Sequence, residues 1–302
     1  MATLRDIKTR IRIVGNIQKI TRAMQLVAAA KLTRAQQRAQ TVRPYADELN
    51  KVLGTLARLV TSDTEDETPM TISFYADKRT LETTREKLFR RGEAQRPAVV
   101  LITSDRGLCG SFNTNLIRAA QNFMSEHPGA RLITLGKKAR GFFKTRKIEP
   151  VLHMEGISDK LPLAQTKEIA SRLVEMFVKN EVDAVHMVYA KHRKGTSYRV
   201  TRQQLLPIPP VEGGEGEDVY ILEPSRDRVF EALVPLYVTT GVLSALADSF
   251  ASEHGARMTA MQQATQNAED KINDLVIQRN RMRQAAITKE LSEIVGGAEA
   301  LR

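Results

Sequence analysis

The sequence predicts an α/β protein in which a long antiparallel coiled coil, formed by the N- and C-terminal segments, is joined to a small Rossmann-like α/β domain. Two observations predict this class. Apolar residues recur every three or four positions through both terminal segments, and three apolar runs of strand length alternate with helical stretches between them. We divide the chain into a first coiled-coil helix (1–60), a charged linker or insertion (61–96), a globular α/β domain (97–225) and a C-terminal coiled-coil helix (226–302).

The first 60 residues show one apolar stripe at helical spacing. It comprises Leu4, Ile7, Ile11, Val14, Ile17, Ile20, Met24 and Val27. Such a narrow stripe is typical of a coiled-coil seam, so we expect all eight residues to face the partner helix. Pro44 should kink this helix or end its first part, because an interior proline loses one backbone hydrogen bond and crowds the preceding turn.

The C-terminal segment repeats the pattern with some drift. Its apolar positions are Leu243, Leu246, Phe250, Met258, Met261, Ala264, Ala268, Ile272, Leu275, Met282 and Ala286. No proline or glycine interrupts residues 257–295, which predicts an unbroken helix of about 60 Å at 1.5 Å per residue. We expect Gly296 and Gly297 to end it, since glycine commonly follows a helix end.

The middle of the chain reads as a mostly parallel sheet covered by helices. The apolar runs 97–103, 131–135 and 184–189 have strand length, with helical stretches near 113–127, 137–146 and 163–180, and 197–206 has the pattern of an added edge strand. Residues 62–68 and 207–218 should be irregular, because they are acidic or rich in proline and glycine. Within 61–96 we expect an added hairpin or helix.

The charge of the chain is concentrated at its start. The formal net charge is +11, and residues 1–60 hold 12 Lys and Arg against 3 Asp and Glu. An acidic partner surface would complement this segment. A coiled coil that binds nucleic acid is the alternative, although no interleaved aromatics or nucleic-acid motif accompany the basic residues. No apolar run approaches the roughly 20 residues of a membrane span, and the mixed charges of the first dozen residues argue against a signal peptide. The segment runs directly into a heptad pattern, so we interpret it as mature structure and not as a transit peptide.

The motifs that carry chemistry in other α/β proteins are missing. The turn 103–113 joins a strand to a helix, where phosphates often bind, but its glycines match neither G-x-G-x-x-G nor a phosphate-binding loop. Cys109, the only cysteine, has no histidine in its motif, so we interpret it as a packed thiol. The five histidines have no metal-ligand spacing, and a site shared by His186 and His192 is only a minor hypothesis. We therefore predict no catalytic residues, no metal and no cofactor.

Four strings, which appear in the order of the family, resemble the gamma subunit of F-type ATP synthases. They are IQKITRAMQLVAAAK (17–31) with RPYA (43–46), SDRGLCG (104–110) with Asn113, the segment 253–267 with ARMTAM (256–261), and NRMRQAAITKE (280–290) leading into EIVGGA (293–298). Together the resemblance covers about 1–60 and 97–302. Relative to that family, 61–96 reads as a longer and more charged connection.

The resemblance implies a non-catalytic rotor of a bacterial enzyme that translocates protons. Its partners would be the alpha and beta subunits of the catalytic head, the epsilon subunit and the membrane c-ring, with one copy of this chain per complex and no nucleic acid. The complex would sit on the cytoplasmic face of the inner membrane. The chain itself would transmit rotation and would carry no cofactor.

The resemblance also implies partner-contact residues, carried over by motif position. Met24 corresponds to a position that faces an acidic lever of a catalytic subunit, and Arg257 to a coupling position on the second helix. Arg283, Gln284, Thr288 and Glu290 match positions that meet the catch loops of the catalytic subunits. Tyr220, Leu222 and Glu223, with Pro224, resemble the segment that touches the membrane ring.

Overall fold

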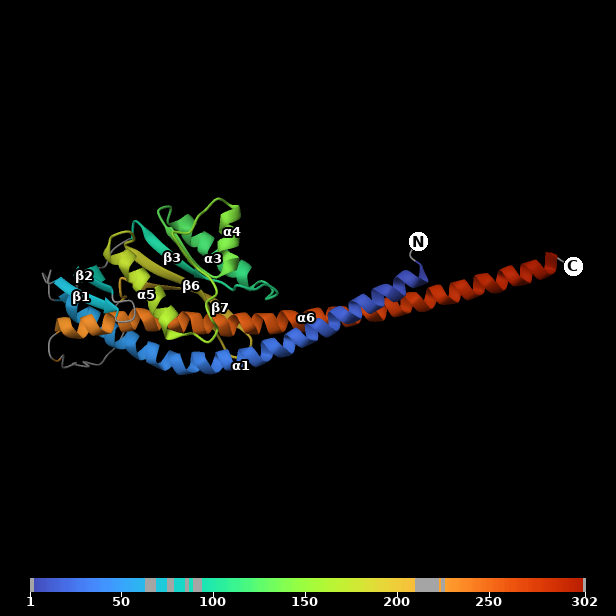
Figure 1. The fold of residues 1–302 in the computed structure, drawn as a ribbon, viewed down its shortest axis with the longest axis horizontal. Helices are drawn as coiled ribbons and strands as arrows, with labels where there is room; N and C mark the ends of the chain where they lie inside the picture. The colour runs from blue at the N-terminus through green and yellow to red at the C-terminus, as the bar shows by residue number, and fades with distance from the viewer. Residues whose placement is uncertain are drawn as a thin grey trace. The chain divides into compact units, whose positions relative to one another are not determined.

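A computed structural model of the chain describes residues 3–62, 69–74, 79–84, 87–88, 94–209, 223 and 226–300. Figure 1 shows the ribbon. The fold combines two long helices with a five-stranded and a two-stranded sheet, which confirms the predicted mixed α/β class. Two compact units can be distinguished, one formed by 1–29 with 257–302 and the other by 30–256. Both long helices contribute to both units.

The larger unit is built on a sheet with strand order β5-β4-β3-β6-β7. These strands are β3 (Pro97–Ile102), β4 (Arg131–Leu135), β5 (Leu152–Met154), β6 (Ala184–His192) and β7 (Tyr198–Leu206). All neighbours pair parallel except β6 and β7. The predicted parallel strands and the predicted edge strand are confirmed, and the edge strand pairs antiparallel with β6. β5 was not predicted, because it has three residues and an exposed histidine at its centre.

Helices cover the two faces of this sheet, and each face has its own apolar core. α3 (Phe112–Glu126) and α4 (Lys137–Thr145) pack on one face, with Phe112, Phe123 and Phe143 almost fully buried. α5 (Leu163–Val178) and the first turns of α6 (Arg226–Ala300) pack on the other face (Figure 1), together with Leu53 and Leu56 of α1 (Leu4–Ser62). All three short helices lie where the sequence predicted them.

The apolar part of α6 is longer than the sequence analysis allowed. A window of 18 residues within Arg228–Val295 has a mean hydropathy of 1.6 and at most two charged residues, which is the composition of a membrane span. Half of that window is buried, and Val234, Val238 and Val242 of α6 belong to the core against the sheet. The core helix of a globular unit has the same composition, and this burial explains the apolar stretch.

A separate pair of antiparallel strands precedes the large sheet. β1 (Pro69–Phe74) pairs with β2 (Arg79–Thr84) from Pro69–Thr84 to Phe74–Arg79. β2 lies against α5. Of the two alternatives predicted for 61–96, a hairpin or a helix, the antiparallel strands confirm the hairpin.

Neither long helix ends where the sequence predicted that it could. α1 continues through Pro44 to Ser62, so the predicted end at Pro44 is wrong, while the alternative of a kink stays a prediction. A proline removes one hydrogen bond, and Ala39 and Ala46 on either side stay buried. α6 continues through Gly296 and Gly297 to Ala300. A glycine costs roughly 1 kcal/mol of helix stability relative to alanine, which does not by itself end a helix.

The buried positions of α1 follow a strict heptad pattern. The residues on this face are buried or half-buried, and the spacing between them alternates between four and three positions. They are Ile7, Ile11, Val14, Gln18, Thr21, Gln25, Ala28, Leu32, Ala35, Ala39, Val42, Ala46, Leu49, Leu53 and Leu56. In the smaller unit the hydroxyls of Thr21 and Thr265 lie 2.8 Å apart. Met261, Ala268 and Leu275 of α6 are buried there too. The predicted antiparallel pairing of the terminal helices is confirmed (Figure 1).

Candidate functional site

A second apolar stripe runs beside the seam on α1. It consists of Ile13, Ile17, Ile20, Met24 and Val27, again at alternating steps of four and three. Its four β-branched members are 47–59% exposed and Met24 is half-buried. At 100° per residue, the stripe is centred about 100° from the seam. Five large apolar side chains in register on one helix, four of them exposed and one half-buried, are a candidate contact surface for a partner.

This arrangement corrects the predicted seam. Ile7 is buried, and Leu4, Ile11 and Val14 are half-buried, but Ile17, Ile20 and Val27 face away from α6. The seam continues instead through Gln18, Thr21 and Gln25, whose polar side chains hid it from an analysis of apolar periodicity. The three successive steps of three residues between Ile11 and Ile20 were the sequence signal of the change, since a seam alternates threes and fours.

A similar apolar surface lies on the last turns of α6. Ile277, Ile287, Leu291, Ile294 and Val295 are 50–66% exposed and fall within an arc of about 100° on the helix. This arc points away from the side on which Leu275 and Ala268 are buried. The prediction that Ala286 lies in the seam is wrong, because Ala286 is exposed. The seam ends with the half-buried Met282.

The four residues predicted to meet catch loops lie in or beside this arc. Gln284 falls inside it, Thr288 and Arg283 lie about 20° beyond its two edges, and Glu290 lies about 40° beyond one edge. All four side chains are exposed. The structure therefore brings these residues together with the apolar side chains on one side of α6, and their contact with partners stays a prediction.

The other predicted contact residues do not form a common surface among the described residues. Arg257 of α6 is half-buried and already interacts within the chain. Glu223 is exposed. Tyr220 and Leu222, with Pro224 and most of the segment 207–218, lie outside the described residues.

The carboxyl edge of the parallel sheet is the usual ligand position in a Rossmann-like domain, at the point where the strand order reverses. That point lies between β3 and β6. Here α6 occupies it: the Ser252 hydroxyl donates to the Ala190 carbonyl of β6 at 2.9 Å, and the Ala190 amide donates to Ser249 Oγ at 3.4 Å. The remaining cavity beside Thr103 and Gly136 is about 20 Å³, which has no room for a nucleotide.

The turn 103–113 satisfies its own polar groups. Asn113 Oδ1 accepts from the Ser104 amide and hydroxyl, both at 3.0 Å. Asn113 Nδ2 donates to Cys109 Sγ at 3.2 Å. Cys109 is 2% exposed and belongs to the core under α3. The structural interpretation of this turn and the packed thiol are confirmed.

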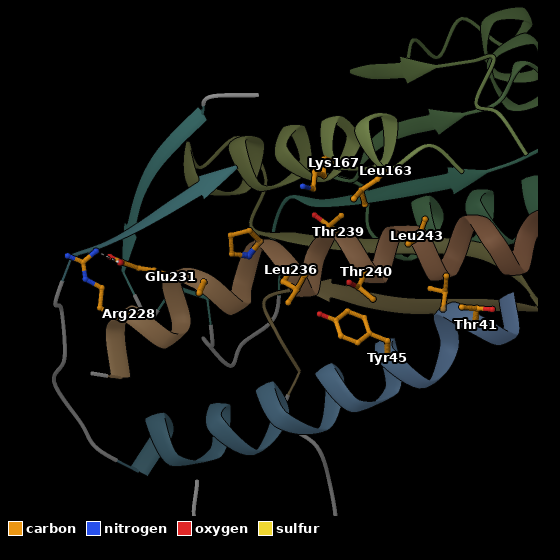
Figure 2. Close-up of a pocket in the computed structure, with 13 residues that line it drawn as sticks. Thr41, Tyr45, Leu163, Lys167, Arg228, Glu231, Leu236, Thr239, Thr240 and Leu243 are labelled. Carbon is orange, nitrogen blue, oxygen red and sulfur yellow. Dashed lines mark hydrogen bonds and ion pairs between the residues drawn. The ribbon is translucent and has the colours of Figure 1, made fainter. Parts of the chain in front are cut away.

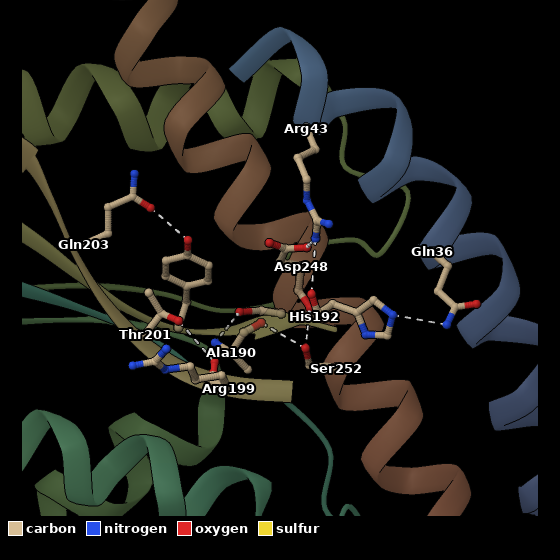
Figure 3. A network of polar contacts seen from close by, with 11 residues as sticks. Gln36, Arg43, Ala190, His192, Arg199, Thr201, Gln203, Asp248 and Ser252 are labelled. Atoms are coloured by element: carbon tan, nitrogen blue, oxygen red, sulfur yellow. Dashed lines mark hydrogen bonds and ion pairs between the residues drawn. The ribbon is translucent and has the colours of Figure 1, made fainter. Parts of the chain in front are cut away.

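Figure 3 shows a polar network between α1, α6 and the end of β6. Arg43 Nη2 lies 2.6 Å from Asp248 Oδ1 and also donates to the His192 carbonyl at 3.3 Å. Burial raises the pKa of Asp248, opposed by the hydrogen bond from Arg43. Burial also lowers the pKa of His192. An ion pair thus joins the two long helices within the larger unit.

Asp159, in the loop before α5, is a second polar anchor. Its carboxylate lies 3.3 Å from Lys31 Nζ of α1 and 3.7 Å from His254 Nε2 of α6. Burial opposes ionisation, but the hydrogen bond and charge of Lys31 hold the Asp159 pKa below its usual value. Arg38 also donates to the Asp159 carbonyl. Both long helices are therefore fastened to the loop before α5 by polar contacts, in addition to their apolar packing on the sheet.

His186 and His192 make separate contacts and do not share a site. His186 packs on the ring of Phe123, and burial lowers its pKa to about 4. His192 instead contacts Gln36 of α1. Across residues 94–209 and the long helices, no group of three or more His, Cys, Asp or Glu residues could hold a metal.

A largely apolar cavity of about 800 Å³ lies between α1, α5 and the start of α6. Figure 2 shows Tyr45, Leu163 and Leu236 around it. Tyr45 and Leu163 are about half exposed. The cavity is an open groove of the larger unit. Its charged lining residues are Lys167, Arg228 and Glu231, and Arg228 pairs with Glu231 at 3.2 Å, so the groove is a binding surface lined mainly by apolar side chains.

Comparisons of the sequence and the fold with known proteins show the class of protein to which the chain belongs. The family model described as ATP synthase matches residues 3–301, so the chain is a subunit of that class of enzyme. It is 43% identical over 300 residues to the ATP synthase gamma chain of Symbiobacterium thermophilum, covering 98% of this chain and 97% of that one. It is 42% identical to that of Desulfitobacterium hafniense over 302 residues, all of both chains. The chain belongs to the ATP synthase gamma-chain family.

Solved structures agree on the fold. A chain of the central stalk and c-ring structure of the Tetrahymena thermophila mitochondrial ATP synthase superposes with a TM-score of 0.58 at 24% identity, over 81% of this chain and 99% of that one. A chain of the OSCP/F1/c-ring structure of the Euglena gracilis enzyme gives 0.67 at 19% identity, over 99% and 94%. The comparisons give no support to the nucleic-acid alternative.

Proposed function

We propose that this chain is the central-stalk rotor subunit of a proton-translocating F-type ATP synthase and transmits rotation between the membrane ring and the catalytic head. The observation that carries the proposal is the full-length match to bacterial gamma chains at about 40% identity. The two apolar surfaces of the smaller unit support it, because exposed apolar stripes at heptad spacing fit a subunit enclosed by partners.

The proposal assigns partners to separate parts of the chain. The alpha and beta subunits would enclose the second stripe of α1 and the apolar arc of α6. The segment around Glu223 would face the c-ring, and the epsilon subunit would bind the larger unit. One copy of the chain would serve each complex, on the cytoplasmic face of a bacterial inner membrane.

The chain is proposed to be non-catalytic, and the isolated protein is expected to show no ATPase activity. The physical reason is that α6 fills the position where an α/β domain of this kind would hold a nucleotide, leaving about 20 Å³. Phosphate release would be measured with purified chain and magnesium ATP. Activity that persists through purification and is lost on unfolding would contradict the non-catalytic role.

The rotor function is tested by complementation. Membrane vesicles from a bacterial host that lacks its own gamma chain should not acidify with ATP, and expression of this chain should restore both acidification and the attached ATPase. Restored ATPase without acidification would mean that the chain assembles but does not couple. No restoration of either, with the chain present and folded, would argue against the proposed function.

A further inference from the structure

A polar pocket of about 730 Å³ lies between α1 and the hairpin that joins β6 to β7. It is separate from the apolar groove and from the helix surfaces assigned to partners. Its lining comprises Gln36, Ala39, Gln40, Arg43, His192, Arg193, Lys194, Gly195 and Ser197. The lining thus contains three cationic side chains, two amides and a hydroxyl, and no carboxylate.

Two donors of the pocket are held in place by other contacts. Gln36 Nε2 donates to the Gly195 carbonyl at 3.0 Å and lies 3.2 Å from His192 Nε2. Arg43 is fixed by Asp248 and by the His192 carbonyl. Figure 3 shows these side chains converging from α1 on the end of β6. Groups that are already ordered lose little conformational entropy when a ligand binds.

The hairpin supplies the uncompensated charge. The Arg193 amide donates to the Ser197 carbonyl at 2.9 Å, and the Ser197 hydroxyl donates to the Lys194 carbonyl at 3.0 Å, so one backbone and one side-chain hydrogen bond close the turn. Gly195 has a φ of +72°, which suits glycine in this turn. The side chains of Arg193 and Lys194 are exposed beside the pocket. Asp248 balances Arg43, which leaves these two charges for a ligand.

We propose that this pocket binds a small phosphate-bearing anion. Arginine and lysine are the side chains that bind phosphate oxygens best. Arg193 and Lys194 would make these contacts, since the Gln36 amide and the Ser197 hydroxyl already donate within the chain. The concave shape and the absence of a carboxylate in the lining favour a compact anion of high charge. The site is partly exposed, so its affinity should fall steeply with added salt.

The test uses the full chain and inorganic pyrophosphate as the probe. The protein has five histidines, so histidine-selective NMR can follow His192 at the pocket against His127 and His153 elsewhere. Pyrophosphate at low ionic strength is expected to shift the His192 signals in a saturable way and to leave the other two unchanged. The Arg193→Ala/Lys194→Ala variant should bind at least tenfold more weakly.

Lys137→Ala/Lys144→Ala is the matched control, since it removes two exposed charges from α4 and should bind as the unchanged chain does. Vesicles containing phosphatidic acid distinguish the source of the phosphate: binding that depends on Arg193 and Lys194 but occurs only with vesicles assigns a lipid headgroup. An equal loss in the control variant, or no saturable His192 shift with either probe, overturns the proposal. Binding only to an acidic peptide overturns it as well, in favour of a protein surface.

Discussion

Replacing Arg43 by alanine is expected to lower the free energy of unfolding of the larger unit by about 2–3 kcal/mol. The Asp248 side chain is 4% exposed and Arg43 Nη2 is its ion-pair partner at 2.6 Å. Removing the guanidinium leaves the Asp248 carboxylate buried without a counter-charge. The free energy of burying this unpaired charge exceeds the net stabilisation that the intact ion pair provides. The Arg43 side chain is 37% exposed, which keeps the figure below that of a fully buried pair. Amide hydrogen exchange of β3 and β6 measures the stability of this unit specifically.

The stability lost in the Arg43→Ala variant should depend on pH. Burial raises the folded-state pKa of Asp248, so the stability contributed by its protonated form is lost as pH rises through that pKa. Without Arg43 the folded pKa rises further. The loss caused by Arg43→Ala should therefore be largest near neutral pH and should shrink as acid protonates Asp248.

Two variants separate the ion pair from a general effect of the substitution. Arg43→Ala/Asp248→Asn should recover at least half of the lost stability, because the asparagine side chain carries no charge to bury. Arg34→Ala removes an exposed charge from the same helix and should change stability by less than about 0.5 kcal/mol. A cost for Arg43→Ala that is independent of pH and is not relieved by adding Asp248→Asn would show that lost packing, and not the unpaired charge, is responsible.

Most elements of the fold could be predicted because their signals are local. The apolar runs of β3, β4 and β6 predict buried parallel strands, since both faces of such a sheet are covered. Helical periodicity likewise predicted α3, α4 and α5. β5 gave no signal, because three residues contain no period and two of them are only half-buried.

The phase of the coiled coil could not be read from apolar residues alone. A residue lies in the seam because of its position in the heptad, whatever its polarity. Small or polar residues are tolerated there when their polar groups have hydrogen-bond partners. Thr21 and Thr265 are an example: their hydroxyls lie 2.8 Å apart, and each also lies within hydrogen-bond distance of a carbonyl of its own helix. The apolar pattern therefore moved from the seam to the second stripe after Val14.

The polar contacts that fasten the long helices had no sequence signal. Arg43 and Asp248 are 205 positions apart, and Lys31 and Asp159 are 128 apart. Neither pair belongs to a motif with fixed spacing, so only the fold brings them together. By contrast, the exposed positions of Gln284 and Thr288 follow from helix geometry once the seam is known.

The Ile17→Asp/Ile20→Asp variant is expected to reduce ATP-driven proton pumping in complemented vesicles at least tenfold. Both side chains are about half exposed in the second stripe of α1, so the chain should fold with unchanged helicity. If a partner covers the stripe, however, two carboxylates must be buried without counter-charges, which costs several kcal/mol. Vesicle acidification measures coupling, and circular dichroism of the purified chain measures helicity.

Asn16→Asp/Ala23→Asp provides the matched comparison, because it adds the same two charges on the exposed side of α1 outside the stripe. It should retain most of the pumping. Similar losses of pumping in both variants would mean that this part of α1 tolerates no additional aspartate at any exposed position. Normal pumping by Ile17→Asp/Ile20→Asp would mean that the stripe faces solvent in the working complex. A loss of pumping only in the stripe variant would place Met24, which lies between Ile20 and Val27, within the same contact surface. The predicted contact of Met24 would then have a physical cause, because Met24 belongs to a row of apolar side chains held in heptad register beside the seam.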